Sequence, residues 1–184
     1  EKDTIAFRGK KVHAQKKIYI AMNKPVGYVS SAKKYKDPTL LDLLPLKERL
    51  YPVGRLDKNS SGLILLTNDG NLALELTHPR YGHEKEYMVT TQKPVSPDAL
   101  KKLQKGVMGE EGLLRAKRIE LLGEKKLRVI LDEGKKRQIR HMLEGVRNAV
   151  ATLERVRVGN IKIGNLKARE WRYLTEEEVK KLQF

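Results

Sequence analysis

Residues 52–70, PVGRLDKNSSGLILLTNDG, carry the clearest structural signal in the chain. An arginine, a leucine and an aspartate, Asp57, stand ahead of a small polar loop, and the apolar run 63–66 follows this loop. A short apolar run bounded by turn residues predicts a buried strand. Asp57 is therefore expected in a loop that a rigid strand holds in place, and such loops often carry catalytic side chains.

Asp57 has two interpretations. An aspartate ahead of Lys-Asn-Ser-Ser-Gly is a good turn former, because its side chain can accept hydrogen bonds from nearby backbone amides. The segment GRLDKNSSGLILLTNDG, however, resembles the catalytic motif of the RsuA-like pseudouridine synthases, which modify ribosomal RNA. In that family the aspartate of GRLD is the catalytic residue, and the resemblance assigns this role to Asp57.

The length, cysteine content and net charge of the chain limit the classes of protein to which it can belong. The chain has 184 residues, and a chain of this size buries roughly 70% of its unfolded surface, enough for one core or two small lobes around a cleft. The absence of cysteine from the sequence excludes disulfides and thiolate metal sites and fits a reducing cytoplasm. A formal net charge of +16 favours a polyanionic partner. An anionic membrane would also attract such a chain, but no apolar run approaches the roughly 20 residues of a spanning helix, so nucleic acid is preferred.

The first part of the chain predicts a strand, a turn and a helix near the Asp57 loop. Residues 18–22 are a compact apolar run typical of a strand, and the segment NKPVGY at 23–28 breaks it with proline and glycine. The RsuA-like family carries a similar NKPxG loop here. Lys24 in this loop either meets RNA phosphate or is simply solvated. Residues 71–77 predict a helix, and we prefer Asp69 as its N-cap over a role as a second catalytic carboxylate.

The segment EKEYMVTT at 84–91 alternates in the manner of a half-buried strand. Tyr87 on this strand is an ordinary core tyrosine when judged from the residues alone. The segment also resembles the family's KxY motif, whose tyrosine packs against the target base. Lys85 and Tyr87 point to the same face of a strand, so both are expected to line one cleft.

The remaining segments predict helices and antiparallel strands. A helix ending at Lys105 is followed by Gly106, a typical stop signal. Residues 113–122 and 127–131 predict one hairpin, and residues 151–162 predict one or two further strands. The candidate helix caps are Thr39, Ser96 and Thr175, the last in a capping box. Strands in runs, interleaved with helices, favour an α+β fold with a largely antiparallel sheet.

The second informative stretch is EGKKRQIRHMLEGV, residues 133–146. Its apolar residues fall at helical spacing, and Lys136, Arg140 and Arg147 lie along another side. A basic helical face is usually just solvated. In the family, however, the last basic residue of RQIR pairs with the catalytic aspartate, and this residue corresponds to Arg140. We expect its guanidinium to hold Asp57 bidentately.

The resemblance covers nearly the whole chain after residue 17. Residues 155–175, RVRVGNIKIGNLKAREWRYLT, match the family's ending, but residues 168–170 are Ala-Arg-Glu where the family often has glycine, which puts a local turn in doubt. The resemblance implies two lobes around a central cleft. It also implies that residues 1–17, which are too polar to form a core, are the end of an N-terminal RNA-binding module and that residues 18–184 are the catalytic domain.

The resemblance implies a monomeric isomerase that converts one uridine of ribosomal RNA to pseudouridine without metal or cofactor, with 23S RNA preferred over 16S RNA. Asp57 attacks the sugar, attacks the ring or abstracts a sugar proton, Tyr87 stacks on the base and Arg140 anchors the carboxylate. The residues expected to contact the RNA are Arg55, Lys24, Lys85, Lys136, Arg137 and Gln138.

Two other classes of protein are alternatives to this prediction. A non-catalytic RNA-binding or ribosome-assembly protein explains the charge equally well. A metal-dependent nuclease needs clustered carboxylates, and Asp42, Asp57, Asp69 and Asp132 are scattered without metal-ligand spacing.

Overall fold

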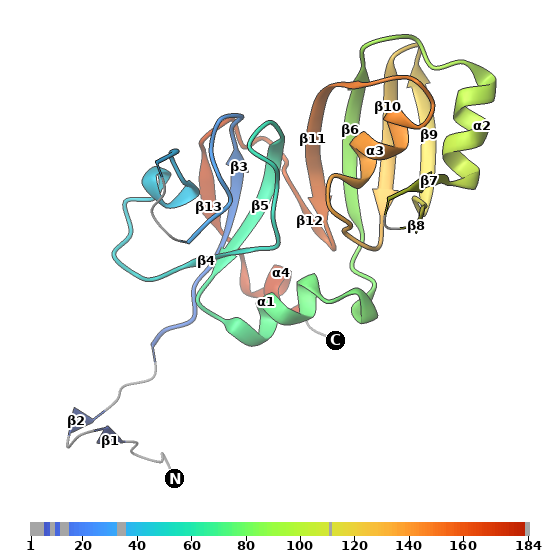
Figure 1. Cartoon of the computed structure of the whole chain (residues 1–184). Coiled ribbons are helices and arrows are strands. Elements are labelled where there is room, and N and C mark those ends of the chain that lie inside the picture. The colour runs from blue at the N-terminus through green and yellow to red at the C-terminus, as the bar shows by residue number, and fades with distance from the viewer. Residues whose placement is uncertain (1–5, 8–9, 12–14, 33–35, 111, 183–184) are drawn as a thin grey trace.

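The computed structural model describes residues 6–7, 10–11, 15–32, 36–110 and 112–182. The described residues from 18 onward form two lobes that share one sheet (Figure 1). Within these residues the sheet has nine strands. Seven follow the order β13-β3-β5-β11-β6-β10-β9, while β4 pairs with β5 and β12 pairs with β11. The strands are β3 (Tyr19–Lys24), β4 (Tyr51–Val53), β5 (Ser61–Thr67), β6 (Lys85–Thr91), β9 (Arg118–Gly123), β10 (Lys126–Leu131), β11 (Val150–Val158), β12 (Ile161–Lys162) and β13 (Trp171–Tyr173).

The helices cover both lobes (Figure 1). In the first lobe, α1 (Gly70–Thr77) and α4 (Glu176–Lys180) lie below the sheet, and the 3-10 helix η1 (Leu40–Leu43) lies beside it. In the second lobe, α3 (Gln138–Glu144) lies over one face of the sheet and α2 (Pro97–Lys105) lies beside β9. A second 3-10 helix, η2 (Pro79–Tyr81), leads from α1 toward β6.

The joint between the lobes is the pairing of β5 with β11. This pairing is parallel, whereas the other strand pairings of the sheet are antiparallel, and its register matches Glu154 with Ser61 and Arg155 with Gly62. Gly62 has a φ of +104°, and a Cβ built there would lie 2.3 Å from the Arg155 carbonyl oxygen. Glycine is therefore required where the two lobes meet. The α+β fold with a largely antiparallel sheet is confirmed.

The central strands of the first lobe, β3 and β5, are buried on both faces. Ile20 and Ile64 belong to a core cluster that also contains side chains of α2 and α3, while Ala21 and Leu65 belong to a second cluster with residues of α1. A strand buried on both faces has a continuous apolar sequence without alternation. This is why residues 63–66 stood out as an uninterrupted apolar run.

The predicted helix starts are confirmed. The Asp69 side chain accepts a hydrogen bond from the Leu72 amide at the start of α1, and Ser96 does the same for α2. Thr39 is the N-cap of η1, and Thr175 forms the predicted capping box at the start of α4. These motifs are local, so the sequence alone suffices to predict them.

Two predicted elements were wrong. Residues 113–122 are not one strand, because β8 (Gly112–Leu114) pairs with β7 (Val107–Gly109) in a separate two-stranded sheet, and only β9 pairs with β10. The helix over 133–146 is shorter than predicted, because Arg137 is left-handed and α3 begins at Gln138. Lys136 therefore lies in the turn before the helix.

The N-terminal segment contains a small antiparallel pair, β1 (Ala6–Phe7) with β2 (Lys10–Lys11). Residues 8–9, between these two strands, lie outside the described residues. Among the described helices, none has the length and apolar character needed to cross a membrane.

Candidate active site

The loops after β3, before β5 and before α3 meet at one end of the sheet. β3 ends at Lys24, which lies opposite Gly62 near the start of β5. The loop that carries Asp57 therefore enters the sheet at the same end as the turn after β3. From the second lobe, the side chains of Arg137 and Arg140 reach this loop.

Asp57 and Arg140, far apart in the sequence, lie side by side. Arg140 Nε is 3.7 Å from Asp57 Oδ2, which is an ion pair without a hydrogen bond. Arg140 Nη2 instead donates to the Asn59 carbonyl oxygen at 3.0 Å and to Ser60 Oγ at 3.1 Å. The predicted bidentate contact was wrong, because the guanidinium also bonds the backbone of the loop that follows the aspartate.

Arg137 brings a second guanidinium to the same carboxylate. Its Nη1 lies 3.8 Å from Asp57 Oδ2, and its side chain is 41% exposed. Its backbone has a φ of 52° and a ψ of 28°, the left-handed region that a residue with a Cβ rarely adopts. The partly exposed side chains of Asp57 and Arg137 therefore face solvent together, where a substrate can reach them.

Gln138 explains the shape of the turn before α3. Its side-chain carbonyl accepts from the Lys135 amide, and its amide group donates to the Arg115 carbonyl oxygen and to Glu133 Oε1. Gln138 is buried at 2% exposure. The prediction that it contacts RNA was wrong, since its polar atoms are used inside the protein.

Lys24 is also not available to RNA in this structure. It is completely buried, and its Nζ donates to the Ser60 carbonyl oxygen at 2.6 Å, to the Pro25 carbonyl oxygen at 3.0 Å and to the Lys58 carbonyl oxygen at 3.4 Å. Burial lowers the pKa of Lys24 to about 8, with Arg155 adding to the shift and Asp57 opposing it. Both interpretations of Lys24, phosphate contact and solvated lysine, were wrong. The side chain holds the loop that follows Asp57.

Tyr87 and Lys85 lie on β6, next to β11. Tyr87 is 8% exposed, belongs to the core cluster and pairs in register with Arg155. Burial lowers the pKa of Lys85, and the nearby Arg155 lowers it further while Asp132 opposes this. Both side chains therefore lie close to the joint between the lobes, where β11 meets β5.

Arg155 was not recognised from the sequence. It is 3% exposed, its Nε donates to the Leu63 carbonyl oxygen at 2.7 Å, and its buried Nη2 has no hydrogen-bond partner among the described residues. A buried unpaired guanidinium nitrogen is costly. Arg155 adds a positive charge beside Lys24 and Lys85, and in addition to burial it lowers the pKa of both lysines. The available signal was an arginine at an inward position of the alternating strand LERVRV.

Besides Arg137, two of the predicted RNA contacts are exposed. Arg55 lines an open groove of about 640 Å³ together with Ser30, Gly54 and Leu74. Lys136 is exposed in the turn before α3. Among the described residues, the ion pairs of Asp57 are with Arg137 and Arg140, so Arg55 and Lys136 add exposed positive charge outside these pairs.

Comparison with known proteins gives a consistent result. A family model described as RNA pseudouridylate synthase matches residues 18–145. An uncharacterized RNA pseudouridine synthase of Aquifex aeolicus (strain VF5) is 37% identical over 100% of this chain and 79% of its own length. The ribosomal small subunit pseudouridine synthase A of Salmonella typhimurium is 38% identical over 88% of this chain and 72% of its own. The crystal structure of a pseudouridylate synthase superposes with a TM-score of 0.85 at 31% identity, covering 92% of this chain and 75% of that one.

Proposed function

This chain belongs to the RsuA-like group of the RNA pseudouridylate synthase family, and from that premise we propose that it isomerises a uridine of ribosomal RNA with Asp57 as the catalytic residue. The observation that carries the proposal is the pair of guanidinium groups, Arg140 and Arg137, at 3.7 and 3.8 Å from the Asp57 carboxylate. The ribosomal substrate is supported by the name of the Salmonella relative and by the formal charge of +16.

The reaction breaks the bond between ribose and the ring nitrogen and remakes it to a ring carbon. A carboxylate acts as a nucleophile or base only in its ionised form, and guanidinium groups, which stay protonated, are the strongest side-chain partners for that form. Arg140 also donates hydrogen bonds to Asn59 and Ser60 in the loop that follows Asp57. It therefore positions the carboxylate as well as pairing with it. We assign Tyr87 to packing against the base.

A uridine locked in a base stack cannot rotate, so the target has to be unpaired or extruded, at a cost of roughly a few kcal/mol. Phosphate contacts offset this cost, and the side chains we propose for them are Arg55, Lys85, Lys136 and Arg137. Each neutralised phosphate of a single strand contributes a slope of about −0.7 in log affinity against log salt concentration. Four such contacts predict a slope of about −3.

We retain 23S RNA as the favoured substrate and the cytoplasm as the compartment, with the protein acting as a monomer. The name of the Salmonella relative refers to the small subunit, so the test includes 16S RNA with equal weight. We further propose that residues 18–184 are the catalytic domain and that residues 1–17 belong to an RNA-binding module.

The decisive experiment incubates the protein with unmodified 16S and 23S RNA and maps pseudouridine by carbodiimide-dependent primer-extension stops. We expect one new stop, and we expect Asp57→Asn to abolish it. Asp98→Asn, an exposed aspartate in the first turn of α2, is the matched control and leaves the stop intact. An active Asp57→Asn protein overturns the assignment of Asp57. Tight RNA binding without any stop indicates a non-catalytic RNA-binding protein instead.

A further inference from the structure

Among the described residues, the non-glycine residues with positive φ are all arginines: Arg137, Arg147 and Arg169. The left-handed conformation costs a residue with a Cβ about 1 kcal/mol or more relative to glycine. Arg137 places its guanidinium beside Asp57. Arg169, with a φ of 74°, stands where the sequence departs from the glycine that the family often carries.

The loop that holds Arg169 is fastened to the active-site end of the sheet. The Arg169 amide donates to the Asn23 carbonyl oxygen, and the Asn23 amide donates to the Glu170 carbonyl oxygen, both at 2.9 Å. In the turn after β3, the Gly27 amide donates to the Lys58 carbonyl oxygen at 2.8 Å. Arg169 is therefore connected through β3 and its turn to the residue that follows Asp57.

One aromatic ring lies against this arginine, and two more follow it in the sequence on β13. The guanidinium carbon of Arg169 lies 5.7 Å from the centroid of the Tyr28 ring. Trp171 and Tyr173 follow on the same side of β13, with ring centroids 5.5 Å apart in an edge-to-face arrangement, and Tyr173 is 54% exposed. We call these four residues the β13 edge: Tyr28, Arg169, Trp171 and Tyr173.

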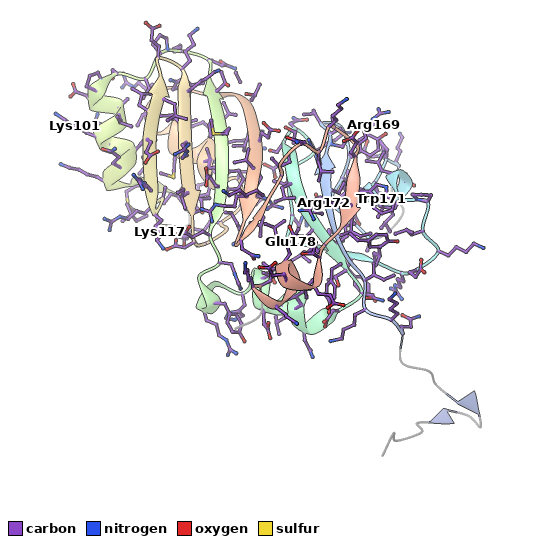
Figure 2. All side chains as sticks on the ribbon, turned by 180° about the vertical axis from the view of Figure 1, so that it is seen from behind. Lys101, Lys117, Arg169, Trp171, Arg172 and Glu178 are labelled. Carbon is purple, nitrogen blue, oxygen red and sulfur yellow. The ribbon has the colours of Figure 1, made fainter. Side chains whose placement is uncertain are left out.

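Arg169 carries the guanidinium of this edge, whereas the neighbouring Arg172 is paired elsewhere. Arg172 lies on the other side of β13 and binds both carboxylate oxygens of Glu178 at 2.7 Å (Figure 2). The carboxylate of Glu170 accepts from the Lys167 amide at 2.8 Å. Figure 2 shows Arg169 and Trp171 on the first lobe, away from the second lobe.

We propose that the β13 edge binds an unpaired segment of the same RNA whose uridine enters the Asp57 site. This inference rests on the proposed function. Aromatic rings and guanidinium planes are the surfaces on which unpaired RNA bases stack, and the guanidinium also attracts phosphate. β3 alone separates β13 from β5, so the edge lies about 10 Å from the strand that follows Asp57. Nucleotides close to the target are within reach of it.

Trp171 provides a direct test, because it is the only tryptophan in the sequence. The experiment titrates the Asp57→Asn protein with a short oligouridine RNA and records Trp171 fluorescence. We expect a saturable change in emission. On this background Arg169→Gly, which suits the left-handed backbone, weakens the affinity about tenfold, the equivalent of one stacked base.

Arg147→Gly is the matched control, because Arg147 is exposed in the second lobe, has a φ of 58° and loses the same charge and strain. We expect it to retain the fluorescence change and to lose less affinity than Arg169→Gly. RNA that binds without altering Trp171 emission, or equal affinities for the two glycine variants, overturns the inference. Because the titration uses the Asp57→Asn protein, its result does not depend on catalysis, and primer-extension mapping tests the proposed function separately.

Discussion

The burial of Lys24 makes the free energy of unfolding of this protein depend on pH. Its pKa is lowered from 10.5 to about 8, chiefly by burial. Between these two pH values the unfolded chain binds a proton at this lysine and the folded chain does not, so the free energy of unfolding rises with pH across the window. At 1.36 kcal/mol for each pH unit, the rise amounts to about 3 kcal/mol.

Lys24→Met removes this titration together with three hydrogen bonds to backbone carbonyls. Urea denaturation of both proteins is measured from pH 8 to 10.5. We expect the wild type to gain about 3 kcal/mol relative to the variant across this range. Lys101→Met, on the exposed side of α2, is measured alongside to correct for the removal of a lysine charge. A difference between wild type and Lys24→Met that stays constant across the window refutes the lowered pKa of Lys24.

Three further changes test the joint, the C-terminal helix and the site. Gly62→Ala places a Cβ 2.3 Å from the Arg155 carbonyl oxygen at a φ of +104°, and we expect urea denaturation to show a loss of about 3 kcal/mol or more. Hydrogen bonds from Arg172 lower the pKa of Glu178 to about 2, so its contribution is present above pH 4.5 and is lost as the pH falls toward 2. We expect Glu178→Gln to cost about 1 kcal/mol at neutral pH, since both side chains are partly solvated, and to lose most of this cost by pH 2. Arg140→Lys keeps the charge but loses the fork that bonds both the loop and Asp57, and we expect single-turnover rates to fall about a hundredfold with little change in RNA affinity.

The elements that the sequence predicted correctly are those specified by local physics. Asp69, Ser96 and Thr175 each satisfy amide groups a few residues away, so their role follows from spacing alone. The uninterrupted apolar run 63–66 likewise predicted a buried strand, which the structure shows as β5.

The errors arose where a distant partner decides the local structure. Residues 113–122 were predicted as one strand, but their first part pairs with β7 and their last part with β10. Which partner each part takes depends on the three-dimensional arrangement and not on the local sequence. The helix predicted from residue 133 starts five positions later because Gln138 bonds Arg115 and Glu133 and shapes the preceding turn. The hydrophobic periodicity of the segment carries no information about these hydrogen bonds.

The candidate site shows the same division. Residue types alone left Asp57 as a turn former and Arg140 as part of a solvated helical face, and only the family resemblance paired them. Lys24 was misinterpreted because a lysine in a loop looks solvated unless the three carbonyl groups around it are known. Arg155 was missed because its burial depends on Gly62, which lets β5 approach its backbone.

The site is assembled across a short strand pairing, β5 with β11, and this determines what holds its halves together. β5 and β11 share a short parallel register, so backbone hydrogen bonds alone align the two lobes weakly. Charged side chains supplement this joint, because Arg155 Nε donates to the Leu63 carbonyl oxygen and Arg140 donates to Asn59 and Ser60. Both arginines belong to the second lobe and bond the segment that runs from Asp57 into β5. The groups that make the cleft electropositive are therefore also the groups that set the distance between the catalytic carboxylate and the second lobe, and a substitution of either one changes charge and alignment together.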